Sequence, residues 1–205
     1  MHFEPDHINH VYNRGNNKVK IFFTSANYMF LLKKIKTEWL PCCDVLCYCL
    51  MPNHFHFMLQ PKPEGCIPIK QQDKLSHLQV LSKTIGKTLS SYTQAINIQN
   101  KTTGTLFQKK TKAKCLTNIS LTFPKYTSQD YLANCFYYIH NNPLIAGLVN
   151  ELKGWPYSSW PDYYGYRIGT LNNKEIFMTR AGFSNLDFNS AKHVNINKKV
   201  IGQIW

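Results

Sequence analysis

Residues 44–60, DVLCYCLMPNHFHFMLQ, contain two apolar runs separated by a turn signal. The first run, residues 44–51, is rich in Val, Leu, Cys and Tyr, and the second, residues 54–60, contains Phe, Met and Leu. Runs of this length and composition predict β-strands. The Pro52-Asn53 pair between them favours a tight turn, so the stretch predicts a β-hairpin.

The segments around this hairpin predict two more strands and a loop. Residues 19–23, with Lys-Ile-Phe-Phe at the centre, predict a short strand. Residues 105–116 follow a turn at Gly104 and predict a strand with a basic face. Residues 65–72 contain no such pattern, and we expect a loop there.

Three segments have apolar residues at helical spacing. The clearest spans residues 75–96, where an apolar residue recurs every three or four positions for about six turns. Two other helices are expected after Ser25 and Ser128, which are suitable caps. Pro143 is expected to end the last helix or to follow its end closely. The order β-α-β-β-α-β-α favours an α+β fold in which helices sandwich an antiparallel sheet.

His54 and His56 lie two positions apart in the second strand of the hairpin. Alternate side chains of a strand share a face, so the two imidazoles point the same way. Phe55, Phe57 and Leu59 then point into the opposite layer. Two imidazoles on one face can bind a divalent metal. The alternative is a pair of half-exposed histidines without a ligand.

The helix predicted after Ser128 places Tyr138 and Asn142 on one line. Its buried stripe consists of Leu132, Cys135, Phe136 and Ile139. Tyr138 lies about 110° from the centre of that stripe, and Asn142 follows one turn later on nearly the same line. Tyr137 points about 150° away from the core centre, to the other side. Tyr138 and Asn142 can therefore act on one site, although a boundary aromatic is the simpler interpretation of Tyr138 alone.

The charge balance of the chain is strongly basic. Its 205 residues include 24 Lys and Arg against 11 Asp and Glu, for a net charge of +13. Such an excess indicates a polyanionic partner, most often nucleic acid, and a nonspecific role is the alternative. No acidic residue occurs between Asp73 and Asp130, where lysines recur. The residues expected to contact nucleic acid are Arg14, Lys83, Lys87, Lys109, Lys110, Lys112 and Lys114.

Composition excludes several classes of protein. No run approaches the roughly 18 apolar residues of a membrane span, and the N-terminus lacks the basic and apolar regions of a secretory signal. The seven cysteines are too sparse for a disulfide scaffold and have no C-x2-C spacing for zinc. We therefore expect a cytoplasmic protein with reduced thiols and no membrane partner.

Together, the histidine strand and the tyrosine helix resemble the HUH (His, hydrophobic, His) single-tyrosine transposases. The most similar branch is the REP-associated tyrosine transposases, which mobilise or process short palindromic repeats in bacterial genomes. The matching segments are residues 10–15 (HVYNRG), 51–56 (MPNHFH), 104–108 (GTLFQ), 138–149 (YIHNNPLIAGLV) and 155–159 (WPYSS). Their order and spacing make the resemblance specific over residues 10–163. Two positions that are often Arg in the family are Lys109-Lys110 and Ile145 here, a difference that concerns DNA recognition rather than chemistry.

The resemblance implies an HUH-endonuclease fold of the ferredoxin- or RRM-like kind. It implies a catalytic domain over residues 1–165 and a C-terminal extension over residues 166–205. It further implies Tyr138 as nucleophile, and His54, His56 and Asn142 as ligands of Mg²⁺ or Mn²⁺. The implied activity is cleavage and rejoining of single-stranded DNA next to hairpin, REP-like palindromic sequences, through a 5′-phosphotyrosine. The DNA would be bound by a monomer or a homodimer.

Two other functions are considered beside this one. The first is a replication initiator or relaxase-type nickase of the same HUH type, although such proteins more often carry extra domains or two tyrosines. The second is a domesticated DNA-binding protein that keeps the fold without catalysis. The presence of His54, His56, Tyr138 and Asn142 argues against a silent protein, and a covalent-adduct assay separates the two.

Overall fold

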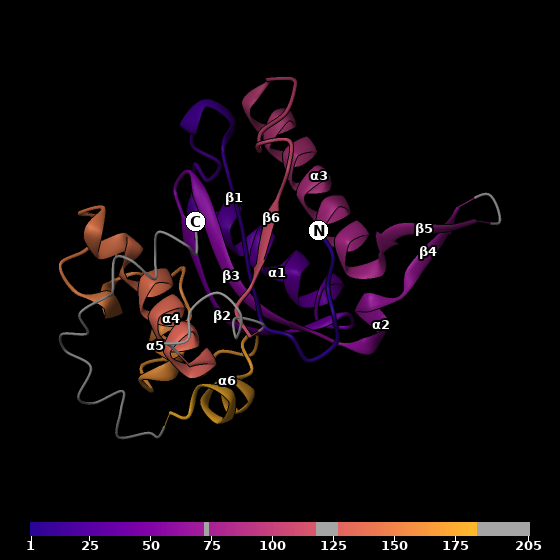
Figure 1. The fold of residues 1–205 in the computed structure, drawn as a ribbon. Helices are drawn as coiled ribbons and strands as arrows, with labels where there is room; N and C mark the ends of the chain where they lie inside the picture. Colours follow the sequence, from indigo (N-terminus) through magenta and orange to yellow (C-terminus); the bar gives the residue numbers. More distant parts are fainter. Residues whose placement is uncertain (72–73, 118–126, 184–205) are drawn as a thin grey trace.

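A four-stranded antiparallel sheet forms the centre of the fold, which a computed structural model describes for residues 1–71, 74–117 and 127–183 (Figure 1). The strands lie in the order β2-β3-β1-β6. Their bounds are Asn9–Arg14 for β1, Cys43–Met51 for β2, His54–Pro61 for β3 and Lys112–Cys115 for β6. The two central strands are therefore β1 and β3, and they pair with each other.

Helices cover both faces of this sheet (Figure 1). On one face, α1 (Ser25–Glu38) and α3 (Val80–Asn100) contribute to one buried core. On the other face, α4 (Ser128–Ile145) and α6 (Lys174–Ala181) contribute to a second core. The remaining elements are η1 (Asn16–Lys18), α2 (Pro63–Cys66), β4 (Pro68–Gln71), β5 (Lys74–Gln79), η2 (Leu152–Gly154) and α5 (Trp160–Tyr163). The predicted α+β fold, an antiparallel sheet between helices, is confirmed.

The hairpin predicted over residues 44–60 is formed by β2 and β3. Met51 lies opposite His54, and the two residues between them form the turn. The side chains of β3 alternate between the two cores, as its spacing predicted. Those in the core under α1 and α3 are Phe55, Phe57 and Leu59. The opposite face of β3 is consequently left to the histidines and to Met58, on the side of α4.

The first strand of the sheet is β1, so the strand predicted at residues 19–23 is wrong. Residues 19–23 are irregular, and the N–H groups of Ile21 and Phe22 donate to the Pro52 carbonyl at 2.8 and 3.1 Å. Both side chains are buried in the core under α1 and α3. The apolar run therefore reflects a segment packed against the hairpin turn, since burial alone does not require strand pairing.

The helix predicted for residues 75–96 begins only at Val80, because the preceding residues form β5. β5 pairs with β4 in a separate two-stranded hairpin that projects from the rest of the fold (Figure 1). Gln79 marks the change to α3, with extended backbone angles at the N-cap. Its buried amide accepts from the Phe3 N–H and donates to the Phe3 carbonyl, each at 2.7 Å. A contact with the N-terminal segment, invisible to local periodicity, thus accompanies the start of the helix.

Two further boundaries differ from the prediction. The loop expected at residues 65–72 contains the end of α2 and the strand β4. The strand predicted for residues 105–116 is shortened to β6. Before β6, Phe107 forms an isolated bridge with Gly15, and a loop then connects it to the strand. Side-chain hydrogen bonds from Asn13 hold this loop away from regular pairing.

The caps of α1 and α4 lie one residue before the predicted serines. Thr24 rather than Ser25 caps α1, and Thr127 rather than Ser128 caps α4. At α4 the Thr127 hydroxyl accepts from the Asp130 N–H at 3.1 Å, and the Asp130 carboxylate accepts from the Thr127 N–H at 2.8 Å. This reciprocal pair of hydrogen bonds satisfies two backbone N–H groups at the start of α4.

Pro143 lies inside α4, which continues to Ile145, so the prediction that Pro143 ends or follows the helix is wrong. A proline lacks the N–H that would bond to the carbonyl four residues earlier, here that of Ile139. The Asn142 amide Nδ2 lies 3.5 Å from this carbonyl and 2.7 Å from that of Tyr138. These contacts partly replace the missing bond, and the helix continues for two residues beyond Pro143.

Residues 166–183 pack against the body of the fold. Phe177 of α6 is fully buried and stacks on Phe136 of α4 with ring centroids 4.6 Å apart. Arg167 forms an ion pair with the buried Asp162, with Nε 2.6 Å from Oδ1. The division at residue 165 remains a prediction, and residues 184–205 lie outside the described part. Within that part, no helix has the length and apolar character needed to cross a bilayer.

Candidate active site

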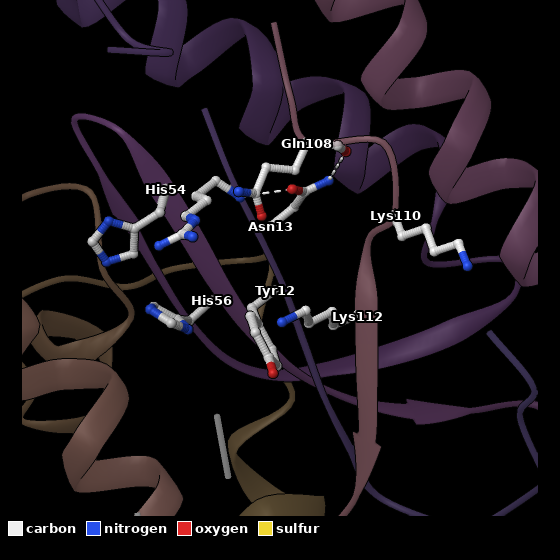
Figure 2. A pocket seen from close by; sticks show the side chains of 8 residues that line it. Tyr12, Asn13, His54, His56, Gln108, Lys110 and Lys112 are labelled. Carbon is white, nitrogen blue, oxygen red and sulfur yellow. Dashed lines mark hydrogen bonds between the residues drawn. The ribbon is translucent and has the colours of Figure 1, made fainter. Parts of the chain in front are cut away.

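β3 presents His54 and His56 on the sheet face that α4 covers, as their spacing predicted (Figure 2). Their ring centroids lie 5.0 Å apart, with the ring planes at 82°. His54, at the start of the strand, is half-buried, whereas His56 is fully buried. A pair of half-exposed histidines is therefore the wrong interpretation for His56. The exposed part of the histidine pair is therefore at His54.

Each of these imidazoles has its Nδ1 atom engaged by a neighbour. Nδ1 of His54 lies 2.7 Å from Oδ1 of Asn53. Since an amide oxygen only accepts, the proton lies on Nδ1 of His54, and its Nε2 carries the lone pair. Nδ1 of His56 lies 2.9 Å from Nε2 of His10. Metal-binding histidines commonly have this arrangement, in which the second ring nitrogen is held by another group.

α4 brings Tyr138 and Asn142 to the same two histidines. The Tyr138 ring meets the His56 ring edge-on, with centroids 5.5 Å apart and planes at 78°. The Asn142 side chain forms a hydrogen bond with His54. Because Nδ2 of Asn142 donates to the Tyr138 carbonyl at 2.7 Å, its Oδ1 is the amide atom that can accept from a protonated His54 or bind a cation. Two strand residues and two helix residues predicted for the site therefore lie together.

Tyr137 lies on the other side of α4 from this site. Its ring is 6.4 Å from Trp160 and 6.0 Å from Phe183, both measured between centroids. The prediction that Tyr137 and Tyr138 serve different environments is thus consistent with the structure. The prediction that Tyr137 points away from the core is wrong, because residues 160–183 cover that side and leave it only 6% exposed.

Burial lowers the pKa of both site histidines below the ordinary value. For His54 the main cause is desolvation, which the hydrogen bond with Asn142 opposes and the charge of Arg14 reinforces. For His56 desolvation is again the main cause, followed by the neighbouring His10 and His54. Both rings are therefore neutral near pH 7, and the neutral imidazole is the form that binds a metal.

The donor atoms at the site fit a divalent ion held by two imidazoles and one amide. The described residues contain no group of three or more His, Cys, Asp or Glu side chains placed to hold a metal ion, so an ion at the histidine pair would need the amide as its third protein donor. Since Nδ1 of His54 contacts Asn53 and Nδ1 of His56 contacts His10, Nε2 is the nitrogen of each ring that could bind an ion, and Oδ1 of Asn142 could add an oxygen. Three protein donors leave positions open for phosphate oxygens and water.

Two more residues of the site, His10 and Tyr12, are not among the predicted site residues. Both belong to β1, where Tyr12 lies directly opposite His56, and the two rings are 6.0 Å apart between centroids. Their spacing of two residues is the same signal that identified His54 and His56. That signal can be used only when residues 9–14 are recognised as a strand.

A pocket of about 180 Å³ opens beside the histidines (Figure 2). Its lining residues are Tyr12, Asn13, Arg14, His54, His56, Gln108, Lys110 and Lys112. Nζ of Lys112 lies 5.8 Å from the centroid of the Tyr12 ring, in a cation–π contact. Nδ2 of Asn13 donates to the Gln108 carbonyl at 3.1 Å, which fixes the loop before β6 at the rim of the pocket. Three of the predicted basic residues thus border the histidine site.

The other predicted basic residues lie elsewhere. Lys114 is exposed on β6, opposite His10 of β1 in the sheet register. Lys109 is exposed in the adjoining loop and does not line the pocket. Lys83 and Lys87 are exposed on α3, which covers the opposite face of the sheet. The acid-free segment of the sequence is therefore divided between two faces of the molecule.

An antiparallel sheet with two alternating histidines on a central strand, faced by a tyrosine from a covering helix, is the arrangement expected from the resemblance to HUH-type transposases. The comparison with solved structures agrees. The chain is similar to the structure of a REP-associated tyrosine transposase bound to a REP hairpin, with a TM-score of 0.56 and 14% sequence identity. The match covers 84% of this chain and 88% of that chain. No protein-family model and no curated protein sequence matches the chain. The likeness confirms the predicted fold.

Proposed function

We propose that the protein cleaves and rejoins single-stranded DNA next to a hairpin, with Tyr138 as the nucleophile. The observation that carries this proposal is the edge-on approach of the Tyr138 ring to His56, at 5.5 Å between centroids. The two residues come from a helix and a strand that are far apart in the sequence. A phenol beside two neutral imidazoles combines a nucleophile with a site for a divalent ion.

The covalent step balances as a transesterification. The phenol oxygen of Tyr138 forms a bond to phosphorus while the bond from phosphorus to the 3′ oxygen breaks. The phenol loses its proton, and the 3′ oxygen leaves as a hydroxyl. The products are a 5′-phosphotyrosine and a free 3′-OH. Because the phosphodiester count is unchanged, attack by a 3′-OH on the phosphotyrosine reverses the step and joins strands without a nucleoside triphosphate.

His54, His56 and Asn142 would hold the ion of this site, Mg²⁺ or Mn²⁺. When bound, the ion offsets the negative charge on the nonbridging oxygens of the scissile phosphate. Both histidines line the pocket, but His56 is fully buried, whereas His54 is half-buried. The DNA strand would therefore approach from the side of His54 and the pocket.

The basic rim of the pocket supports a nucleic acid as the substrate. Arg14, Lys110 and Lys112 border the same cavity as the two histidines, so their charges lie where a DNA backbone would enter. The protein of similar fold was solved with a REP hairpin bound. This supports a hairpin-bearing single strand as the DNA class, with the hairpin next to the cleaved bond.

The test is a covalent-adduct assay on a labelled single strand that carries a hairpin, incubated with Mn²⁺ and resolved on a denaturing gel. The unaltered protein should give a shifted protein–DNA band together with a shorter strand ending in a 3′-OH. Tyr138→Phe should give neither, while its ring keeps the packing of α4. Tyr137→Phe is the matched control, since the neighbouring ring packs against Trp160 and Phe183 instead.

The alternatives give other outcomes in the same assay. A catalytically silent DNA-binding protein would bind the strand without any adduct or cleavage. Cleavage that persists in Tyr138→Phe would indicate hydrolysis by a metal-activated water, and thus a nuclease.

A further inference from the structure

His10 occupies the centre of the ring cluster at the site. It is fully buried in β1, on the same sheet face as Tyr12 and the histidines of β3. Its ring stacks on Tyr12 with centroids 4.7 Å apart and on His56 with centroids 5.1 Å apart. It also meets the Tyr138 ring edge-on at 6.2 Å. His10 therefore contacts the residues of both the strand and the helix that form the site.

A hydrogen bond connects His10 directly to His56. Nε2 of His10 and Nδ1 of His56 are 2.9 Å apart, so one of these nitrogens carries the shared proton. If His10 donated the proton, His56 would be protonated on Nε2 and would offer its lone pair only at Nδ1, which His10 already occupies. If His56 donates from Nδ1, its Nε2 lone pair is available on the other edge of the ring. The proposed metal site requires the second arrangement.

We infer that His10 is a positioning residue, which accepts the Nδ1 proton of His56 and thereby fixes the ring orientation and tautomer that present Nε2 to a divalent ion. The inference rests on the proposed function, because it assumes that His56 is a ligand. Asn53 has the corresponding role at His54, where Oδ1 accepts from Nδ1 at 2.7 Å. The ring orientation of each proposed ligand is thus fixed by a different group, Asn53 in the turn for His54 and His10 in the neighbouring central strand for His56.

The first experiment separates positioning from packing by measuring Mn²⁺ affinity without DNA. Free Mn²⁺ is followed by electron paramagnetic resonance during titration of the full chain. His10→Phe keeps a flat ring in the stack and removes the acceptor, so the affinity should fall by about 10- to 100-fold. His10→Gln loses the ring and provides an amide oxygen as acceptor, so it should recover most of that loss. Unchanged affinity in His10→Phe, or weaker binding in His10→Gln than in His10→Phe, would overturn the inference.

His140 provides the matched control for a buried histidine. Its exposure is 1%, and its nitrogens contact the Phe136 carbonyl and the Ser159 hydroxyl, each at 2.9 Å. His140→Phe should lower the melting temperature, while its Mn²⁺ affinity should stay within about twofold of that of the unaltered protein. This change is much smaller than the loss expected for His10→Phe. An equal loss of affinity in both Phe variants would show a general effect of disturbing the core, and would contradict a specific role for His10.

A second measurement needs no variant to fold. Long-range ¹H–¹⁵N correlation spectra of the unaltered, metal-free chain report which nitrogen of each histidine carries the proton. His56 should have its proton on Nδ1, and a His56 signal from the Nε2–H tautomer would refute the inference. Neither this spectrum nor the Mn²⁺ titration depends on a covalent DNA adduct. A failure of Tyr138 to form the adduct therefore leaves both results interpretable for His10.

Discussion

Removal of the three charges around the pocket should weaken DNA binding in a salt-dependent way. The variant combines Arg14→Gln, Lys110→Gln and Lys112→Gln, all on exposed side chains that line the pocket. Each phosphate neutralised on a single strand contributes about 0.7 to the slope of log K against log salt concentration. Three such contacts contribute about 2 to this slope. With equal affinities at 1 M salt, a slope difference of about 2 makes the variant bind about 100-fold more weakly at 0.1 M salt. The difference should shrink steadily as the salt concentration approaches 1 M.

The assay is fluorescence anisotropy of a labelled hairpin strand, repeated between low and high salt without divalent ions. Lys83→Gln combined with Lys87→Gln is the control, because these lysines come from the same acid-free segment and lie on α3, across the sheet from the pocket. Their removal should leave the slope nearly unchanged. If the control variant lowers the slope as much per charge as the pocket variant does, the DNA path deduced from the pocket is wrong.

Further predictions concern the metal site and stability. His54→Ala should abolish cleavage while hairpin binding persists, and His56→Ala should in addition lower the melting temperature because its ring is fully buried. Asn142→Ala should only raise the Mn²⁺ concentration needed for cleavage, since water can replace an amide oxygen. Chelation with EDTA should stop adduct formation and leave hairpin binding in a mobility-shift assay intact. Burial lowers the pKa of His140 to about 3, so below pH 6.5 the unfolded chain binds a proton that the folded chain does not. The free energy of unfolding should therefore fall between pH 6.5 and pH 3, by about 2 kcal/mol at pH 5 from this residue.

Each of these expectations has a contradicting result. Full cleavage by His54→Ala at low Mn²⁺ would remove His54 from the metal site. An adduct that forms equally well in EDTA would show that no divalent ion takes part. For the pH dependence, urea unfolding of His140→Gln at pH 7 and pH 5 is the comparison. The variant should lose about 2 kcal/mol less than the unaltered protein over this interval, and equal losses would refute the cause assigned to His140.

Local sequence patterns predicted those parts of the site that lie within a single strand or helix. The strand alternation of residues 54–60 placed His54 and His56 on one face, and helical spacing placed Asn142 one turn after Tyr138. Both patterns survive folding because they follow from backbone geometry alone. The hairpin was predictable for the same reason, since its turn residues and both apolar runs are contiguous.

The parts that sequence patterns missed depend on contacts between distant segments. β1 is buried on both faces, yet it contains His10 and Asn13, whose polar atoms are satisfied by His56 and by the loop before β6. No apolar alternation marks such a strand. Tyr137 looked exposed because the helix pattern cannot reveal that residues 160–183 cover it. Burial by other segments, rather than local propensity, decided each of these cases.

The most direct test of the account locates the covalent bond on the chain. The trapped protein–DNA adduct is digested with nuclease and protease, and mass spectrometry identifies the tyrosine that keeps the nucleotide. Among the described residues, Tyr138 and Tyr12 both lie near His56, with ring centroids at 5.5 and 6.0 Å, so the measurement distinguishes real alternatives. A 5′-linked nucleotide is expected on Tyr138 alone. Attachment to Tyr12 or to any other residue would contradict it.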